Sequence, residues 1–378
     1  MIYFDNAATT PVSREAAEAV NRMMDSVFGN PSSLHSAGLA AEREIKAAAE
    51  TIADILKVRP DEIYFTSGGT ESNNLAIIGA AMARRRLGTH IITSRVEHPS
   101  VENAMKALES EGFEITRLPV SQSGLLNPAD AVDAVRGDTI LVSLMQLNNE
   151  TGAVFDIAKI SGLIKEKSSR VLFHTDGVQA FCKEPLNMAH VDLYSLSAHK
   201  IHGMKGAGAL FIRKGVTIKP LLYGGGQQRG IRPGTENTPG IVSLAAAAKA
   251  QMKNLRQTRE RVLMIKNELV GLAEELDDVF INGFGSPYIL NMSFPGVKGE
   301  TLVHALERED IYISTGAACN SKHAGNTSLQ ALRLGTERVN SAVRFSFSEL
   351  NTLEEAVKCK EAVIKTVIML RRNIQKSH

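Results

Sequence analysis

The sequence predicts an α/β fold: a mainly parallel sheet of seven strands flanked by helices, followed by a smaller α+β domain toward the C-terminus. Two observations support this prediction. Short apolar runs typical of strands alternate with amphipathic helical patterns up to about residue 213, as they do in successive βαβ units. The 378 residues are 43% hydrophobic, which suffices for one large domain and a smaller one.

The elements of the large domain follow from apolar periodicity. Amphipathic helices are expected at residues 14–27 and 37–56, and a further helix begins within 71–78. The last two strands lie too close together for a helix between them, so one edge of the sheet is expected to be antiparallel. The seven predicted strands span residues 63–66, 90–93, 114–119, 139–145, 171–175, 193–196 and 209–213.

Residues 238–276 show a helical pattern, first rich in alanine and then charged. We interpret its first part as a spine that joins two domains. Beyond it, helices alternate with strands expected at 289–294, 311–314 and 343–347. We therefore predict a large domain at residues 14–255 and a small domain formed by residues 1–13 and 256–378.

Charge and composition argue against several classes of function. The formal net charge is +2, from 43 basic and 41 acidic residues, so bulk electrostatics does not indicate nucleic-acid binding. No apolar run reaches the roughly 18 residues of a membrane span, and the first residues lack the basic and apolar pattern of a signal peptide. We expect a cytoplasmic protein that contacts neither membrane nor nucleic acid.

The cysteines and histidines indicate no metal site. The chain has three cysteines, an odd number, at widely spaced positions: Cys182, Cys319 and Cys359. None of them belongs to a C-x-x-C motif. This usage is typical of free thiols in a reducing cytosol, and not of a disulfide framework or a zinc site. The ten histidines show no metal-ligand spacing, so we expect no metal.

A lysine lies where a strand is expected to end. Residues 191–196 alternate as a buried strand does, and the sequence SAHK follows directly at 197–200. Ligands of open α/β sheets bind at the carboxyl ends of the strands. Lys200 could there form a Schiff base with a carbonyl cofactor. The alternative is a solvated lysine at a strand exit.

A glycine-rich turn, SGGT at 67–70, joins a predicted strand to a predicted helix. The free backbone N–H groups and the positive dipole end of such a helix suit a phosphate group. The turn is neither a P-loop nor a dinucleotide fingerprint, because neither motif occurs in the chain. The alternative is a plain strand–turn–helix with a threonine cap.

A carboxylate ends the strand predicted before the lysine segment. Asp176 follows the apolar run 171–175. It could hold the protonated pyridine nitrogen of pyridoxal 5′-phosphate, the usual cofactor of lysine Schiff-base enzymes of this kind. Asp176 could instead cap the following turn. Because Asp176 and Lys200 are 24 residues apart, about one βαβ step, both can reach one crevice.

Nine motifs match one family in order and spacing. They are DNAATT at 5–10, GNPSSLH at 29–35, SGGTESNN at 67–74, EH at 97–98, NNETG at 148–152, DGVQ at 176–179, SAHK at 197–200, RPGTEN at 232–237 and STGAAC at 314–319. Over nearly its whole length, the chain resembles the cysteine desulfurases of the class V aminotransferase family, in particular the NifS/IscS-like group I branch.

The resemblance implies a fold-type I pyridoxal-phosphate homodimer that converts L-cysteine to L-alanine and leaves a persulfide on an enzyme cysteine. By position, Lys200 is expected to be the Schiff-base lysine and the general base at the substrate Cα. Asp176 is expected to pair with the pyridinium nitrogen, and His98 to stack on the ring, where it could also shuttle protons. Arg344 is expected to grip the substrate carboxylate with its guanidinium fork.

The resemblance also assigns the remaining contacts of cofactor and substrate. These are Gln179 and Asn149 near the phenolic oxygen, with Asn149 also beside the substrate; Gly69, Thr70, Ser197 and His199 at the phosphate; and Thr235 at the phosphate of the other subunit.

Cys319 is the sulfur acceptor that the resemblance implies. It lies in the segment 314–328, which is rich in Gly, Ala, Ser and Asn and is predicted to be a flexible loop. An exposed, mobile thiol can attack the substrate sulfur and carry it elsewhere, whereas burial makes a thiol inert. Cys182 and Cys359 fall in patterned apolar segments, and we predict that both are inert core residues.

The final acceptor of the sulfur stays open: a cluster scaffold, a tRNA-thiolating enzyme or another sulfur carrier. Two further alternatives are a selenocysteine lyase or small-amino-acid aminotransferase of the same family, and a catalytically silent sulfur-relay or scaffold protein. Aminotransferases need no loop cysteine, so Cys319 argues against that activity. The intact set Lys200, Asp176, His98 and Arg344 argues against a silent protein.

Overall fold

The computed structural model describes residues 1–315 and 328–375. Its centre is a seven-stranded sheet with the strand order β2-β8-β7-β6-β5-β3-β4. The predicted strands are confirmed, and no end differs from its predicted position by more than one residue. The strands are β2 (Ile63–Thr66), β3 (His90–Ser94), β4 (Glu114–Leu118), β5 (Thr139–Met145), β6 (Leu172–Asp176), β7 (Leu193–Ser197) and β8 (Gly208–Ile212).

The antiparallel pairing predicted at one edge of the sheet is present, and the antiparallel strand β8 lies one place in from that edge. β8 runs antiparallel to both of its neighbours, β7 and β2, whereas the other neighbouring strands are parallel. The short connection from β7 to β8 leaves no room for a crossover helix, which forces antiparallel pairing. β2 comes much earlier in the chain and takes the edge beside β8, a non-local pairing that chain order does not reveal.

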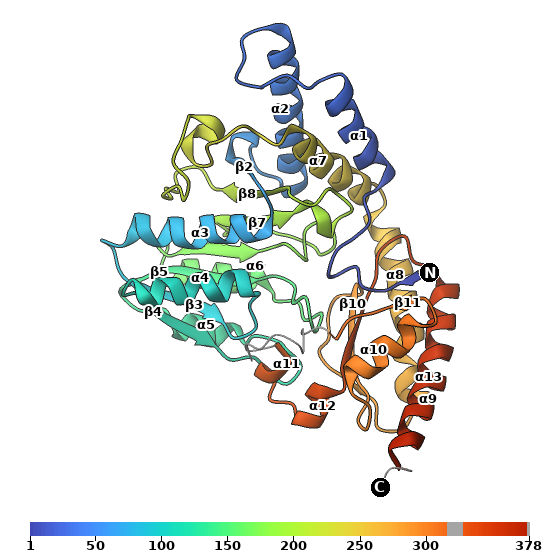
Figure 1. Cartoon of the computed structure of the whole chain (residues 1–378). Coiled ribbons are helices and arrows are strands. Elements are labelled where there is room, and N and C mark those ends of the chain that lie inside the picture. The colour runs from blue at the N-terminus through green and yellow to red at the C-terminus, as the bar shows by residue number, and fades with distance from the viewer. Residues whose placement is uncertain (316–327, 376–378) are drawn as a thin grey trace.

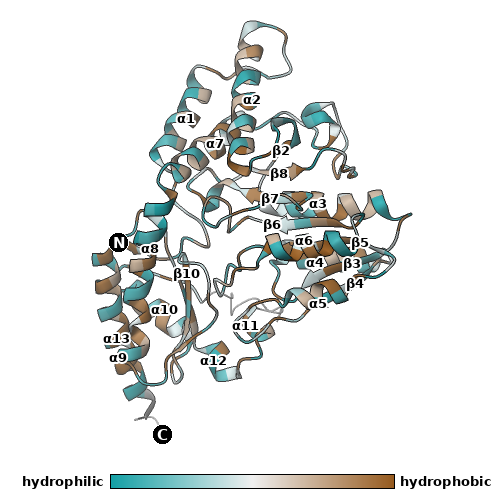
Figure 2. Ribbon diagram, turned by 180° about the vertical axis from the view of Figure 1, so that it is seen from behind, coloured by the Kyte–Doolittle hydropathy of each residue, from teal (hydrophilic) through white to brown (hydrophobic). Residues whose placement is uncertain are grey.

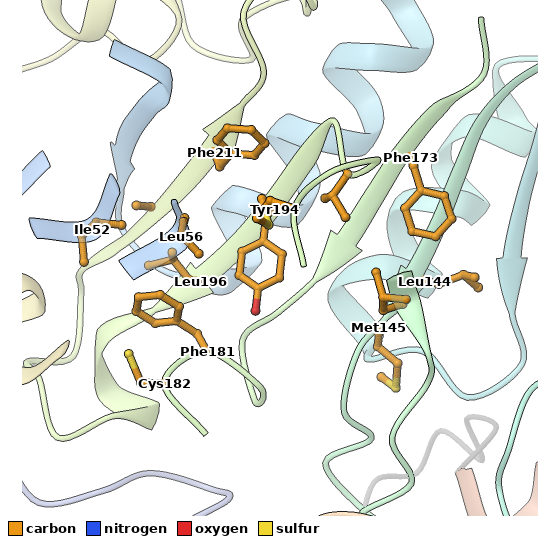
Figure 3. Packing of buried hydrophobic residues seen from close by; sticks show 14 of the residues in the cluster. Ile52, Leu56, Leu144, Met145, Phe173, Phe181, Cys182, Tyr194, Leu196 and Phe211 are labelled. Atoms are coloured by element: carbon orange, nitrogen blue, oxygen red, sulfur yellow. The ribbon is translucent and has the colours of Figure 1, made fainter. Parts of the chain in front are cut away.

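Helices cover both faces of the sheet (Figure 1). Successive side chains of a strand point to opposite faces; on β7, Leu193 joins the apolar cluster under α3 and Tyr194 the opposite cluster. Figure 3 shows Tyr194 with Phe173 and Phe211 from the neighbouring strands. The helices of this part are α1 (Arg14–Asp25), α2 (Ser36–Leu56), α3 (Gly69–Arg84), α4 (Pro99–Ser110), α5 (Pro128–Asp133), α6 (Ile157–Lys167) and α7 (Thr238–Lys253).

The C-terminal part has its own apolar core. β9, β10 and β12 form an antiparallel sheet, and Phe4 from the start of the chain packs into the same core as Phe345. The short N-terminal strand β1 (Ile2–Tyr3) pairs in parallel with β11. The elements are α8 (Leu255–Val270), α9 (Leu272–Glu275), β9 (Phe280–Ile281), β10 (Ile289–Ser293), α10 (Gly299–Glu307), β11 (Ile311–Tyr312), α11 (Ser328–Ala331), α12 (Thr336–Asn340), β12 (Ala342–Ser346) and α13 (Leu353–Gln375).

Hydrophobic and hydrophilic residues alternate along most helices (Figure 2), as expected where one face packs on a core. The separate cores agree with a two-domain organisation, while the boundaries at 14–255 and at 1–13 with 256–378 stay a prediction. Within residues 1–315 and 328–375, no helix is long and apolar enough to cross a membrane.

Candidate active site

A cavity of about 260 Å³ opens at the carboxyl ends of β5, β6 and β7. Ligands of open α/β sheets bind at this edge. The structure brings nine of the predicted site residues together around the cavity: Gly69, Thr70, His98, Asn149, Asp176, Gln179, Ser197, His199 and Lys200. Among the described residues, Thr235 and Arg344 are predicted site residues that do not line it.

Lys200 lies one short turn beyond β7, in the 3₁₀ segment Ala198–Lys200. Its Nζ donates to the carbonyl oxygens of Ala7 at 2.6 Å and Ala8 at 2.7 Å. Burial, with the charges of Lys183 and Arg344, lowers the pKa of Lys200 to about 7. A large part of this amine is therefore neutral, and nucleophilic, near neutral pH.

Asp176 ends β6 and faces the same cavity. Its Oδ2 accepts from Asn73 Nδ2 at 2.8 Å, and its Oδ1 accepts from the backbone N–H of Val178 at 2.9 Å. These two donors fix the orientation of a buried carboxylate. A carboxylate held in this way can pair with a cation that enters the cavity.

The turn after β2 forms the end of the cavity nearest to α3. The helix begins at Gly69, and its N-cap Gly68 makes no side-chain cap, so the threonine cap considered from the sequence is wrong. A Cβ at Gly208 would lie 2.6 Å from the Cα of Gly68, which shows how closely the turn approaches β8. The buried Ser197 Oγ has no hydrogen-bond partner among the described residues. Together with the helix N-terminus, it suits an anion.

His98 stands at the N-cap of α4, where its Nδ1 accepts from the backbone N–H of Ser100 at 3.1 Å. Desolvation by the surrounding protein and the charge of Lys200 lower the pKa of His98, although Asp176 opposes them. The ring is nonetheless exposed to the cavity. A neutral aromatic ring in this position can stack on a bound heterocycle.

Gln179 and Asn149 also line the cavity. Gln179 Nε2 donates to the carbonyl oxygen of Ala7 at 2.8 Å. The carbonyl oxygen of Asn149 accepts from Arg344 Nη1 at 2.9 Å. Asn149 thus connects the cavity with the guanidinium group that the family resemblance assigns to the substrate carboxylate.

Arg344, on β12, is almost fully buried and pairs with a carboxylate of the N-terminal segment. Its Nη2 donates to Asp5 Oδ1 at 2.7 Å, in an ion pair that sequence reasoning missed. Its Nε has no partner within residues 1–315 and 328–375. Asp5 is the first residue of the DNAATT motif, and only the position of that motif indicated that it matters.

Of the remaining predicted residues, Thr235 does not line the cavity and Cys319 is not described. Thr235 is exposed. Cys319 falls outside the described residues. The chain enters that segment from Ser314, whose backbone pairs with that of Arg344. It leaves at Ser328, whose N–H donates to Glu150 Oε2 at 3.1 Å.

Sequence reasoning also missed two polar residues in the cavity wall. Asn73 and Ser100 contact Asp176 and His98, respectively. Both line the cavity, but neither was singled out, because Asn73 lies within a longer motif and Ser100 beyond the EH motif. Among the described residues, no group of three or more His, Cys, Asp or Glu could hold a metal ion.

Comparison with known proteins identifies the family. The model of the class-V aminotransferases matches residues 2–358. The chain belongs to this family. A NifS/IcsS protein homolog of Lactobacillus delbrueckii subsp. bulgaricus is 44% identical, with 94% of each chain covered. The cysteine desulfurase IscS of Methanosarcina thermophila is 41% identical over 98% of this chain and 93% of its own.

The fold agrees with this family. A solved structure described as a NifS-like protein superposes with a TM-score of 0.91 and 35% identity, covering 98% of this chain and 99% of the other. The fold is thus that of the fold-type I pyridoxal-phosphate enzymes, as the resemblance implied. The family depends on pyridoxal 5′-phosphate.

The residues around the cavity fit this cofactor. The N-terminal turn of α3 and the Ser197 Oγ, which lacks a partner in the described part of the chain, suit its phosphate. Asp176 offers a carboxylate to the pyridine nitrogen, and the amine of Lys200 can bond to the carbonyl carbon. Lys200 and Asp176 follow neighbouring parallel strands, so both reach the cavity from one edge of the sheet.

Proposed function

We propose that the protein is a cysteine desulfurase that converts L-cysteine to L-alanine and transfers the sulfur to Cys319. The observation that carries this proposal is the meeting of the Lys200 amine and the Asp176 carboxylate in one cavity. The 41% identical relative named as a cysteine desulfurase supports the choice of substrate. The Cβ–S bond of the substrate breaks, an S–S bond forms on the enzyme thiol, and no outside oxidant is needed.

Each side chain has a separate task in this reaction. Bound pyridoxal 5′-phosphate supplies a protonated ring that accepts the electron pair left when the Cα proton is removed. Lys200, with its lowered pKa, is the base that removes that proton. Asp176 keeps the pyridine nitrogen protonated. His98 covers the ring, and Gly69, Thr70, Ser197 and His199 hold the phosphate.

Arg344 orients the substrate by its carboxylate. One Nη already donates to Asp5 and the other to the carbonyl of Asn149. A bound carboxylate therefore shares or displaces the Asp5 contact and can use the Nε–H, which has no partner among the described residues. This arrangement selects a substrate whose carboxylate lies next to Asn149, as in an α-amino acid bound at the Lys200 end of the cavity.

The proposal is tested by incubating the protein with L-cysteine and a reductant and measuring alanine and sulfide together. We expect equal amounts of the two products. A keto acid in place of alanine would instead indicate an aminotransferase, and turnover of selenocysteine without turnover of cysteine would indicate a selenocysteine lyase. The absence of any product would indicate a silent relay protein.

The lowered pKa of Lys200 predicts how cofactor incorporation depends on pH. Only the neutral amine attacks the carbonyl carbon, and the neutral fraction rises with pH. The rate at which added cofactor colours the cofactor-free protein should therefore rise through a midpoint at about 7. Stopped-flow absorbance measures this rate. A rate that still climbs at about pH 10, where an ordinary lysine titrates, would contradict the prediction.

We further propose a homodimer in which Thr235 reaches the phosphate site of the partner. A second cavity of about 370 Å³ lies against the turn 67–70 and also contacts His199, which leaves room for a residue from another chain. Near Thr235 in sequence, Tyr223 is 87% exposed and Leu222 is 51% exposed. Such exposed apolar side chains favour a protein contact.

Shared sites predict complementation between two defective chains. Thr235→Ala should weaken cofactor binding about tenfold, because one hydrogen bond to a charged group is lost. A mixed dimer of Thr235→Ala and Lys200→Ala chains should regain activity, because one of its two sites then contains both native residues. Activity is measured after the two variants are unfolded and refolded together. No gain over the separate variants, or a monomer in light scattering, would contradict a shared site.

The destination of the sulfur is the least determined part of the function. We propose that a separate protein, either a cluster scaffold or a tRNA-thiolating enzyme, takes the persulfide sulfur from Cys319. We also propose a cytoplasmic enzyme, because Cys182 and Cys359 are free thiols and such thiols persist in a reducing compartment.

A further inference from the structure

A series of hydrogen bonds in the cavity wall joins Asp176 to His98. Asn73 Nδ2 donates one hydrogen to Asp176 Oδ2 at 2.8 Å and the other to Ser100 Oγ at 2.9 Å. Ser100 Oγ lies 2.8 Å from His98 Nδ1. The helices that carry Asn73 and Ser100, α3 and α4, pack side by side (Figure 1).

The direction of each hydrogen in this chain follows from the groups involved. A carboxylate only accepts, so Asn73 must donate to Asp176. Both hydrogens of the Asn73 amide nitrogen are then used, and Ser100 Oγ accepts one of them. The hydroxyl hydrogen of Ser100 is left to point at His98 Nδ1.

His98 Nδ1 receives a second donor. The backbone N–H of Ser100 points at the same nitrogen at 3.1 Å, which is how His98 caps α4. A ring nitrogen that accepts two hydrogen bonds carries no proton of its own. The proton of the neutral ring therefore sits on Nε2, on the opposite side of the ring from Ser100.

We propose that Asn73 and Ser100 are positioning residues that fix His98 as the neutral tautomer protonated at Nε2. His98 then presents an N–H donor to the cavity and cannot accept a proton there. Within the proposed desulfurase reaction, on which this part rests, proton removal from the substrate falls to Lys200 alone. Asp176 and His98 are also linked, because the Asn73 amide contacts Asp176 directly and His98 through Ser100.

The charged groups that face His98 are compatible with a neutral ring. Asp176, on β6, favours a positive charge on His98, whereas Lys200, beyond β7, opposes it. Asp176 already accepts from Asn73 and from Val178, so part of its charge is compensated. On α4 itself, the positive end of the helix dipole disfavours a protonated cap.

The tautomer can be read directly from ¹⁵N-histidine NMR of the cofactor-free protein, with His98 assigned through His98→Gln. We expect an unprotonated Nδ1 and a protonated Nε2 at neutral pH. This measurement does not depend on the proposed activity, so the inference and the proposed function can fail separately. A protonated Nδ1 in the native protein would overturn the inference.

Variants of Ser100 separate positioning from simple packing. Ser100→Ala removes the hydroxyl donor and should shift the His98 Nδ1 resonance, while Ser100→Thr keeps the donor and the native resonance. Ser110→Ala, at the exposed far end of the same helix, is the matched control and should change nothing. An unchanged Nδ1 resonance in Ser100→Ala would contradict the role of the hydroxyl.

Steady-state kinetics of the enzyme with bound cofactor provide a second test. Ser100→Ala should lower kcat roughly tenfold, the effect of losing one positioned hydrogen bond, while KM for L-cysteine stays near its native value because Arg344 is untouched. Ser100→Thr should restore kcat. A rise in KM with native kcat would show that Ser100 serves substrate binding and not the position of His98.

Discussion

Lys200→Ala should lower desulfurase activity by roughly 10³-fold or more, since it removes both the covalent anchor of the cofactor and the base. The contacts at the phosphate and at Asp176 remain, so the variant should still bind cofactor without a covalent link. Borohydride reduction followed by peptide mass spectrometry locates that link in the native protein. We expect it on Lys200.

Lys214 provides a control for this substitution. It is exposed and follows the carboxyl end of β8, whereas the turn 67–70 lies at the other end of that strand. Lys214→Ala should keep native activity and native labelling of Lys200. A borohydride label on any lysine other than Lys200 would show that the strand-end lysine is not the cofactor anchor.

Cys319→Ala should retain the cofactor and its colour but lose sulfide release by about 10³-fold, because no other thiol can accept the sulfur. Cys182 is 5% exposed and Cys359 is fully buried. Burial raises the pKa of both thiols far above the usual range, so neither forms the thiolate that attacks sulfur. Absorbance and sulfide assays on the same sample separate cofactor binding from turnover.

Cys182→Ala and Cys359→Ala provide the matched controls for the acceptor. Both should remain active, with at most a modest loss of stability from the small cavities they leave. Full activity of Cys319→Ala, or loss of sulfide release in either control, would show that another cysteine accepts the sulfur.

Most of the sheet could be predicted from the sequence because its signals are local. The bounds of β2 and β5 are those predicted, and the carboxyl ends of β6 and β7 bring Asp176 and Lys200 together as expected. The position of β8 could not be predicted, because it depends on pairing with β2, which lies about 145 residues earlier in the chain. Periodicity reports which face of a strand is buried, but not which strand lies beside it.

The polar contacts around the cavity also could not be predicted from local sequence patterns. Asn73 lies on the buried side of α3, and only the packing of α3 against α4 reveals that it holds Asp176 and Ser100 together. Asp5 pairs with Arg344, which lies more than three hundred residues later in the chain. No local sequence pattern predicts this contact. Residue type, spacing and the family resemblance therefore identified nine residues that line the cavity, but not the contacts that orient them.

The most direct test of the account is a single turnover with L-cysteine in the absence of reductant. The products are trapped with an alkylating reagent and mapped by peptide mass, while free alanine is measured in the same sample. We expect one alanine per active site and one extra sulfur atom on the peptide that contains Cys319. Alanine without a persulfide on Cys319, or a persulfide on Cys182 or Cys359, would contradict the proposed transfer.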